Sequence, residues 1–228
     1  MKKQFRSLVV ALGMSVVLAA CGGGGDASPW MTVDASGAST IQTAALAASL
    51  SALPSEPLSA AEGDSLVFMR EEEKLAHDVY AQFDLLWGAS VRVFGNIAAS
   101  EATHTEAVHQ LLQRYALTDP AASTSAGVFQ DATLQALYAQ LLRVGAASPI
   151  DALEVGAAIE EIDMQDINRA LLTIDNQDIT LVYQNLLKGS RNHLRAFVST
   201  LAVQGVNYVP QYMALADYQA IIDAPMER

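Results

Sequence analysis

The sequence predicts an all-α protein in which four long helices form a bundle, with a long crossover between the second helix and the third. Apolar residues recur at helical spacing over four long segments, which indicates that each helix buries one face. No segment alternates apolar and polar residues as a half-buried strand does. The connection after Asp119 is long enough to hold a short extra helix, as in bundles with one crossover. The expected long helices span residues 59–87, 91–116, 149–172 and 176–203, and the short helix spans residues 131–143.

Capping signals mark the ends of these helices. The pattern Ser-Ala-Ala-Glu at residues 59–62 is a capping box, and Gly88 follows the helix that it opens. Ser148 precedes a proline in the first turn of the third long helix, while Gly145 closes the short one. The bundle is therefore expected to occupy residues 59–205 as one domain, which is large enough to bury a core.

Residues 1–20 have the plan of an export signal. Three basic residues precede an apolar run over residues 8–20, which is too short to span a bilayer comfortably. Leu-Ala-Ala before Cys21 and glycines after it resemble the lipobox of bacterial lipoproteins, which implies cleavage before Cys21 and lipid attachment to it. Gly22 resembles the residue that follows the cysteine in lipoproteins of the outer membrane, so we expect an exported, lipid-anchored protein that faces the periplasm. An ordinary secretory signal and an uncleaved anchor are the alternatives.

Two further segments lie outside the bundle. Residues 21–58 are rich in Gly, Ala, Ser and Thr, so we expect a flexible tether with at most a short helix near residues 41–53. Residues 206–228 form a C-terminal tail, where residues 213–222 could add one short helix.

Charge and cysteine content restrict the classes of partner. The chain has a net charge of −12, and removal of residues 1–20 takes away three basic and no acidic residues, which leaves −15. Nucleic acid is therefore not expected as a partner. Cys21 is the only cysteine, so a lipidated chain has neither a disulfide nor a thiol for catalysis or metal binding.

A carboxylate and an imidazole share the buried face of the second long helix. Glu101 and His104 are three residues apart among apolar residues at helical spacing, so both point into the core. Burying a carboxylate costs several kcal/mol unless a charge, a metal or good hydrogen bonds compensate it. Something else in the core must therefore balance Glu101.

The other long helices supply inward polar groups as well. The helical wheel places Glu72 near the middle of the first apolar face, with Glu73 at its edge and Glu71 pointing away. Glu160 lies in the stripe of the third helix. The remaining inward polar residues are Asp163 about a quarter-turn from that stripe, and Ser190 and His193 on the fourth helix.

A metal ion would resolve the repulsion among these groups. The carboxylates and imidazoles favour iron or manganese, with zinc less favoured and copper least. The alternative is a set of protonated carboxylates that hydrogen-bond to Tyr80, Tyr183 or the histidines.

The arrangement resembles the di-iron carboxylate ferritin-like superfamily, which takes a Glu from each of two helices and Glu-x-x-His from each of two others. More closely, the chain resembles an uncharacterised ferritin-like family labelled domain of unknown function 2202, over residues 62–212. His77 stands where that family is expected to have arginine, and lies off the core face. The blocks that carry the resemblance are residues 69–80, 100–104, 159–163 and 189–197.

The resemblance implies a set of metal ligands and neighbours. The first-helix ligand is Glu72 by the helical wheel or Glu73 by analogy to ferritins, with a slight preference for Glu72. Glu160 has the place of a bridging carboxylate, with Glu161 in reserve. The full implied set is Glu72 or Glu73, Glu101, His104, Glu160 and His193 as ligands, with Tyr80, Tyr183, Asp163 and Ser190 around them.

The fourth helix departs from the superfamily pattern, because Ser190 stands where a glutamate is expected three residues before His193. One carboxylate is missing, so the site holds either one ion or two, with water, Ser190 or Asp163 as substitutes. We therefore expect an exported, membrane-anchored iron or manganese protein, either an oxidase or peroxidase or a non-catalytic metal-binding or structural envelope protein. The sequence does not choose between a monomer and a dimer.

Overall fold

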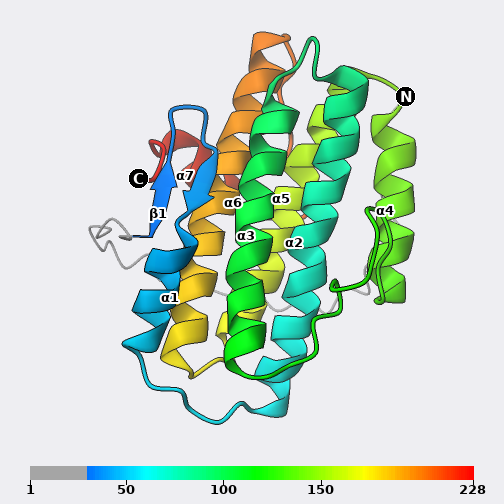
Figure 1. The fold of residues 1–228 in the computed structure, drawn as a ribbon. Coiled ribbons are helices and arrows are strands. Elements are labelled where there is room, and N and C mark those ends of the chain that lie inside the picture. The colour runs from blue at the N-terminus through cyan, green and yellow to red at the C-terminus, as the bar shows by residue number, and fades with distance from the viewer. Residues whose placement is uncertain (1–29) are drawn as a thin grey trace.

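The computed structural model describes residues 30–228, and within them the chain is mostly helical, with one small two-stranded sheet (Figure 1). The expected signal peptide, the expected lipidation site Cys21 and the start of the expected tether lie outside the described residues. No helix in the described part is both long and apolar enough to cross a membrane.

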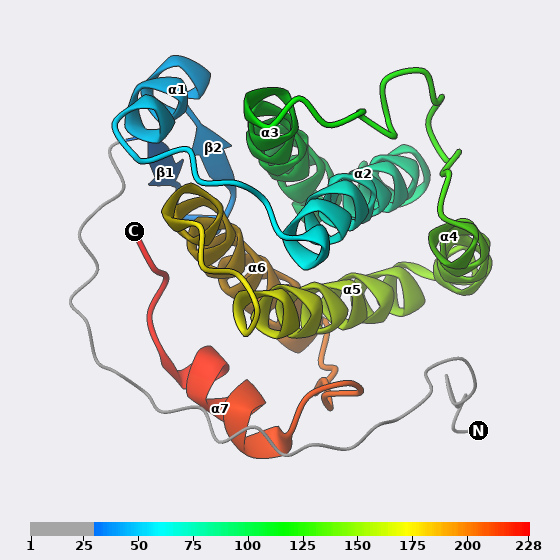
Figure 2. The same cartoon turned by 90° about the horizontal axis from the view of Figure 1, so that it is seen from below.

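Four long helices lie side by side around a shared interior (Figures 1 and 2). Helix α2 (Ala60–Trp87) packs against α3 (Val93–Arg114) and α5 (Pro149–Leu171), and α6 (Gln177–Val203) packs against α5 and α3. Helix α4 (Ala132–Gly145) lies in the crossover between α3 and α5 and contacts α2 and α5 from outside. The all-α prediction is confirmed, and each predicted helix lies within a few residues of an observed one.

The predicted caps are present. Ser59 and Glu62 form a reciprocal capping box at the start of α2, which satisfies two backbone N–H groups. Ser148 accepts a hydrogen bond from the backbone N–H of Asp151 at the start of α5, and Asp131 caps α4 in the same way.

The prediction of a flexible tether is wrong for residues 30–41, whereas the short helix predicted near residues 41–53 is confirmed. Strands β1 (Met31–Val33) and β2 (Ser39–Ile41) form an antiparallel hairpin, and helix α1 (Thr43–Ser51) follows it. Trp30 and Leu46 are buried in the apolar core formed with α2, α3 and α6. Three-residue strands are too short to show an alternating pattern, which explains why the sequence did not predict them.

The hairpin rests against the outside of α3 and α6. Strand β2 contacts α3, and the turn approaches the backbone carbonyl of Asn192 on α6 so closely that a Cβ at Gly37 would lie 2.9 Å from its oxygen. Gly37 also has a φ of 88°, a conformation that favours glycine. The side chain of Asp34 accepts hydrogen bonds from the backbone N–H groups of Ser36 and Ala38, which fixes the turn.

The C-terminal tail also packs on the long helices. Helix α7 (Leu215–Asp223) agrees with the predicted short helix and contacts α6. Glu161 of α5 accepts hydrogen bonds from the Tyr208 hydroxyl and from three successive backbone N–H groups, those of residues 211–213. The tail is therefore attached to the back of α5 by one buried carboxylate.

Two separate apolar clusters fill the interior. On α2, Met69 belongs to one cluster and Leu75 to the other; on α6, Leu186 and Leu194 are divided in the same way. Between the two clusters, α2, α3 and α6 carry buried polar residues, which Glu160 of α5 joins. The fold thus places a polar layer between two apolar layers.

Candidate metal centre

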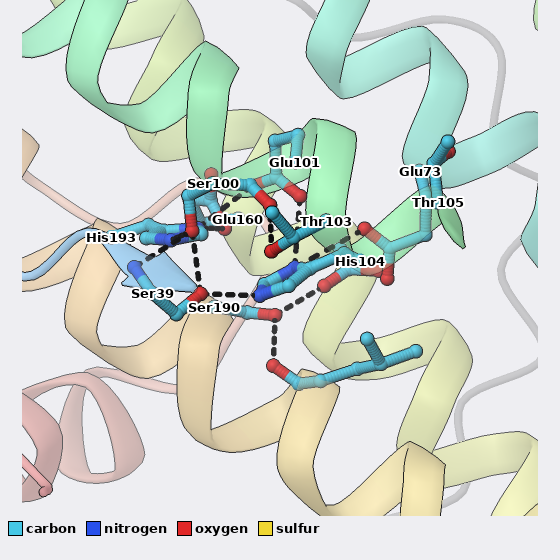
Figure 3. Close-up of polar contacts among 12 residues, drawn as sticks. Ser39, Glu73, Ser100, Glu101, Thr103, His104, Thr105, Glu160, Ser190 and His193 are labelled. Carbon is cyan, nitrogen blue, oxygen red and sulfur yellow. Dashed lines mark hydrogen bonds and ion pairs between the residues drawn. The ribbon is translucent and has the colours of Figure 1, made fainter. Parts of the chain in front are cut away.

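The polar layer receives side chains from all four long helices. Glu73 comes from α2, Glu101 and His104 from α3, Glu160 from α5 and His193 from α6, and none is more than 2% exposed. Figure 3 shows how these side chains converge.

Glu101 lies at the centre of the group. Its Oε2 is 3.0 Å from Nδ1 of His104, and its Oε1 is 2.7 Å from Nδ1 of His193. The spacing of three residues on α3 brings Glu101 to His104, while His193 reaches it from α6. The two imidazole rings stack with their centroids 5.2 Å apart. One carboxylate therefore presents a different oxygen to each histidine.

A second carboxylate flanks each histidine. Oε2 of Glu73 is 3.5 Å from Nδ1 of His104, and Oε2 of Glu160 is 3.5 Å from Nδ1 of His193. Among the described residues, neither Nδ1 atom has a hydrogen bond of acceptable geometry, and neither does Oε1 of Glu73. Buried polar atoms without such partners are uncommon and require an explanation.

Serine hydroxyls hold the outer nitrogens of both rings. Oγ of Ser39 is 2.6 Å from Nε2 of His104, and Oγ of Ser100 is 2.8 Å from Nε2 of His193. The inner Nδ1 atoms are thereby directed at Glu101.

Of the predicted neighbours of the site, Tyr80 contacts a predicted ligand and Tyr183 does not. The Tyr80 hydroxyl donates to Oε1 of Glu160 at 2.6 Å. The Tyr183 hydroxyl instead lies 3.0 Å from Oγ of Ser65.

Asp163 and Ser190 form a pair beside the predicted ligands. The Ser190 hydroxyl contacts Oδ2 of Asp163 and the backbone oxygen of Leu186. Oδ1 of Asp163 is buried and has no hydrogen bond from the described residues.

Electrostatics distinguish the central carboxylate from those around it. Burial opposes ionisation of Glu101, but the imidazoles of His193 and His104 outweigh burial and lower its pKa below the ordinary value. Burial, joined by the Glu101 charge, raises the pKa of Glu73 to about 8. Burial alone would lower the pKa of His193, yet Glu101 and Glu160 raise it to about 9.

The pKa values of Glu160 and Asp163 are shifted in the same direction as that of Glu73. Burial raises the pKa of Glu160 even though His193 opposes the shift. Burial and the charges of Glu73 and Glu160 raise the pKa of Asp163 well above its ordinary value. Protons or a cation must therefore compensate the carboxylates around Glu101.

The structure places Glu73, and not the preferred Glu72, beside His104. Glu72 is also buried, but it lines a pocket with Ile159 and Asp163 of α5. Burial and the charges of Asp166 and Asp163 raise its pKa. A helical wheel separates adjacent residues by about 100° and does not include the rotation of the helix about its axis. That rotation decides which of the two glutamates lies beside His104.

Sequence reasoning missed Ser39, Ser100 and the roles of two glutamates. Glu71 was expected to point away, yet it is buried and accepts hydrogen bonds from the backbone N–H groups of Gln130 and Asp131. Glu161 was held in reserve as a ligand, but it binds the tail. Ser100 directly precedes the predicted ligand Glu101, and this position is the signal in the sequence that could have identified it.

Gly189 on α6 leaves room for the ring of His104. A Cβ at this position would lie 2.4 Å from Cε1 of His104. The ring therefore occupies space that any other residue would fill.

The cluster offers a plausible set of metal-binding atoms. Glu101, His104 and His193 each contribute one ligand atom, and these atoms lie within 4.8 Å of one another. Two imidazole nitrogens with carboxylate oxygens form a donor set that suits divalent first-row metals.

Comparison with known proteins identifies the family. The family model described as "Uncharacterized protein domain (DUF2202)" matches residues 62–225. The chain belongs to the DUF2202 family. This DUF2202 protein is 46% identical over 179 residues to "Uncharacterized protein MJ0754" of Methanocaldococcus jannaschii, which covers 78% of this chain and 96% of that protein.

A solved structure shows the same fold. The crystal structure of hypothetical protein MJ0754 from Methanococcus jannaschii matches this DUF2202 protein with a TM-score of 0.74 at 46% identity, over 77% of this chain and 99% of that chain. The predicted resemblance to the family is confirmed.

Proposed function

We propose that this protein is a ferritin-like metal-binding protein in which Glu101, His104 and His193, with Glu73 and Glu160, hold one or two iron or manganese ions. One observation carries the proposal: both buried Nδ1 atoms face the two oxygens of a single carboxylate, and neither has a hydrogen bond of acceptable geometry from the described part of the chain. A metal ion bound by these atoms would satisfy them together.

The charge of the layer supports a bound cation. Several carboxylates share one interior with two imidazoles, and burial opposes the charge of each. The alternative compensation, in which protonated carboxylates hydrogen-bond to tyrosines, has support at Glu160 through Tyr80. Among the described residues, it leaves Oε1 of Glu73 and both Nδ1 atoms without a hydrogen bond of acceptable geometry.

The arrangement of the helices supports the ferritin-like assignment. Four long helices pack around the site, and α4 lies in the connection between the second and third of them. Each long helix contributes to the layer, as in di-iron carboxylate proteins. The superfamily pattern has a glutamate on the fourth long helix, where this chain has Ser190. Asp163 of α5, a buried carboxylate that the Ser190 hydroxyl contacts, would take the place of that glutamate.

With iron bound, the centre would supply one-electron redox chemistry, which makes a ferrous oxidase or peroxidase the function that this ligand set favours. If two ferrous ions were bound, they would supply the two electrons that, with two protons, convert one peroxide into two waters. The protein's own contribution is to hold the carboxylates and imidazoles in a buried layer, where the Tyr80 hydroxyl fixes the orientation of Glu160.

The same proposal includes export and lipid anchoring at Cys21, supported by the sequence of residues 1–22. Labelling with a radioactive fatty acid in a bacterial host tests it. We expect label on the wild-type chain and none on a Cys21→Ala variant. Equal label on both would contradict anchoring at this residue.

Metal content tests the metal-binding part. Full-length protein is extracted in detergent without chelator, and bound metals are counted by mass spectrometry for wild type, Glu101→Gln and His193→Ala. We expect one or two ions per wild-type chain and none in either variant. His109→Ala is the matched control, because His109 lies outside the layer and pairs with Glu106. A wild-type chain that stays metal-free after anaerobic loading with ferrous iron would contradict the proposal.

A kinetic assay separates the catalytic function from simple binding. The absence of a carboxylate at Ser190 favours binding without turnover as the second candidate. The protein is loaded with ferrous iron under anaerobic conditions and peroxide is then added. Absorbance follows the oxidation of the ferrous iron to ferric iron. Oxidation faster than in the Glu101→Gln variant supports the peroxidase, whereas equal rates with metal bound support the second candidate.

A further inference from the structure

The N-terminal hairpin reaches the metal centre through a buried serine. Ser39 on β2 is 2% exposed, and its Oγ lies 2.6 Å from Nε2 of His104 and 2.5 Å from Oγ of Ser100. Oγ of Ser100 continues to Nε2 of His193 at 2.8 Å. The two histidines are thus joined, behind the site, by a chain of two hydroxyls that can be followed in Figure 3.

The number of hydrogens along this row of contacts limits which histidine nitrogens can act as acceptors. Three contacts link the two rings and the two hydroxyls, but the hydroxyls carry only two hydrogens. If both rings accepted at Nε2, both hydrogens would be used and none would remain for the contact between Ser39 and Ser100. At least one histidine must therefore donate from Nε2.

A hydrogen on Nε2 is also what a histidine needs in order to bind a metal through Nδ1. A neutral imidazole that carries its hydrogen on Nε2 has a free lone pair on Nδ1. Nδ1 is the atom that faces Glu101 on both rings. Hydrogen bonds to the outer nitrogen of a metal-binding histidine set its tautomer and orientation in general.

The hairpin holds Ser39 rigidly against α3. The backbone N–H of Ser39 donates to Oγ of Ser100 at 2.9 Å, so the strand contacts the same hydroxyl twice. Buried side chains at Trp30 and Ile41 fix the two ends of the hairpin, and Gly37 brings its turn against α6. The hairpin residues all precede residue 62, where the match to the family begins.

We propose that the N-terminal hairpin is a working part of the metal centre, and that Ser39 is a positioning residue that, with Ser100, holds both histidines with Nδ1 towards Glu101. This inference rests on the proposed metal-binding function. It assigns a role in the site to a segment outside the matched family domain.

The first test measures the NMR signals of the histidine ring nitrogens in metal-free protein. The chain has four histidines, so nitrogen NMR of full-length protein labelled with ¹⁵N-histidine gives few signals. We expect Ser39→Ala to shift the ring nitrogens of His104 and, through Ser100, those of His193, with His77 and His109 unchanged. Unchanged signals from both inner rings would overturn the positioning role.

The second test measures metal affinity. Cobalt(II) serves as the probe, because its visible absorption reports the ligand geometry. We expect Ser39→Ala and Ser100→Ala each to weaken cobalt binding by about 10–100-fold, with an altered spectrum. Thr40→Ala is the matched control, since Thr40 is the exposed neighbour on the same strand. An affinity of Ser39→Ala equal to that of Thr40→Ala would also overturn the proposal.

The two tests separate failure of this inference from failure of the proposed function. If wild type binds no cobalt but Ser39→Ala still shifts the inner histidines, the metal-binding function fails and the positioning contact stands. If wild type binds cobalt and neither readout responds to Ser39→Ala, the inference alone fails. Thermal unfolding of each variant shows whether the hairpin remains folded.

Discussion

At the scale of single residues, the environment of a side chain decides its chemistry more than its type does. Glu71, Glu72 and Glu73 are consecutive and all buried, yet they have three different surroundings. Glu71 accepts backbone hydrogen bonds from the segment before α4, and Glu73 faces His104. Sequence periodicity predicted that this helix sends a carboxylate inward, but the three roles follow from helix rotation and from a crossover that covers the back of α2.

The space beside Gly189 gives a prediction at this scale. We expect Gly189→Ala to push the His104 ring away from Glu101, because the new Cβ would overlap that ring. Overpacking of this kind costs about 1–3 kcal/mol of stability, and cobalt affinity should fall as well. Urea unfolding and cobalt titration measure the two effects.

Gly63→Ala provides the matched control for that substitution. Gly63 is also in a long helix, but a Cβ there would meet nothing within 4 Å. We expect this variant to be more stable than wild type by roughly 0.5–1 kcal/mol, with unchanged cobalt binding. Equal loss of affinity in both alanine variants would contradict the steric argument.

At the scale of elements, the long helices and the places of the short ones could be predicted, and the N-terminal hairpin could not. Periodicity and caps such as Ser59 locate α2 because a long helix repeats its pattern many times. The hairpin has two three-residue strands, and its one strong signal is the turn from Asp34 to Gly37. Ser39 entered no sequence-based site because the fold, not spacing, brings it beside His104.

The attachment of the tail to α5 gives an element-scale prediction. We expect Glu161→Ala to lower the free energy of unfolding by about 3 kcal/mol, since four donors lose a charged acceptor. Limited proteolysis should then cut within residues 206–228 faster than in wild type. Asp217→Ala, at an exposed acid on α7, should leave both measurements unchanged.

At the scale of the whole molecule, carboxylates attach peripheral segments to the long helices and make the fold sensitive to acid. Burial alone would raise the pKa of Glu227, but Arg191 and Arg195 outweigh it and lower that pKa. A carboxyl whose pKa is lower in the folded state stabilises the fold above its unfolded value of 4.5. That contribution is lost as the pH falls below it.

Glu227 therefore predicts a specific pH profile. We expect wild type to lose stability as the pH falls below about 4.5, and Glu227→Gln to lose less over the same interval. At pH 7, the glutamine variant should be the less stable of the two. Thermal unfolding between pH 3 and pH 7 measures the difference, and parallel curves for the two proteins would contradict the role of the Arg191 contact.

The polar layer connects metal binding to the stability of the entire fold. It lies between two apolar clusters, so burying its charges opposes folding when nothing compensates them. A metal that binds only the folded chain stabilises it by about 2.7 kcal/mol at a free concentration one hundred times its dissociation constant.

We therefore expect manganese to raise the unfolding temperature of chelator-treated wild type. Glu101→Gln should show no rise, because the central carboxylate would lose its charge, while His109→Ala should respond as wild type does. A rise of equal size in Glu101→Gln would show that the ion binds elsewhere on this acidic surface. Absence of any rise in wild type would mean that protons, and not a metal, compensate the layer.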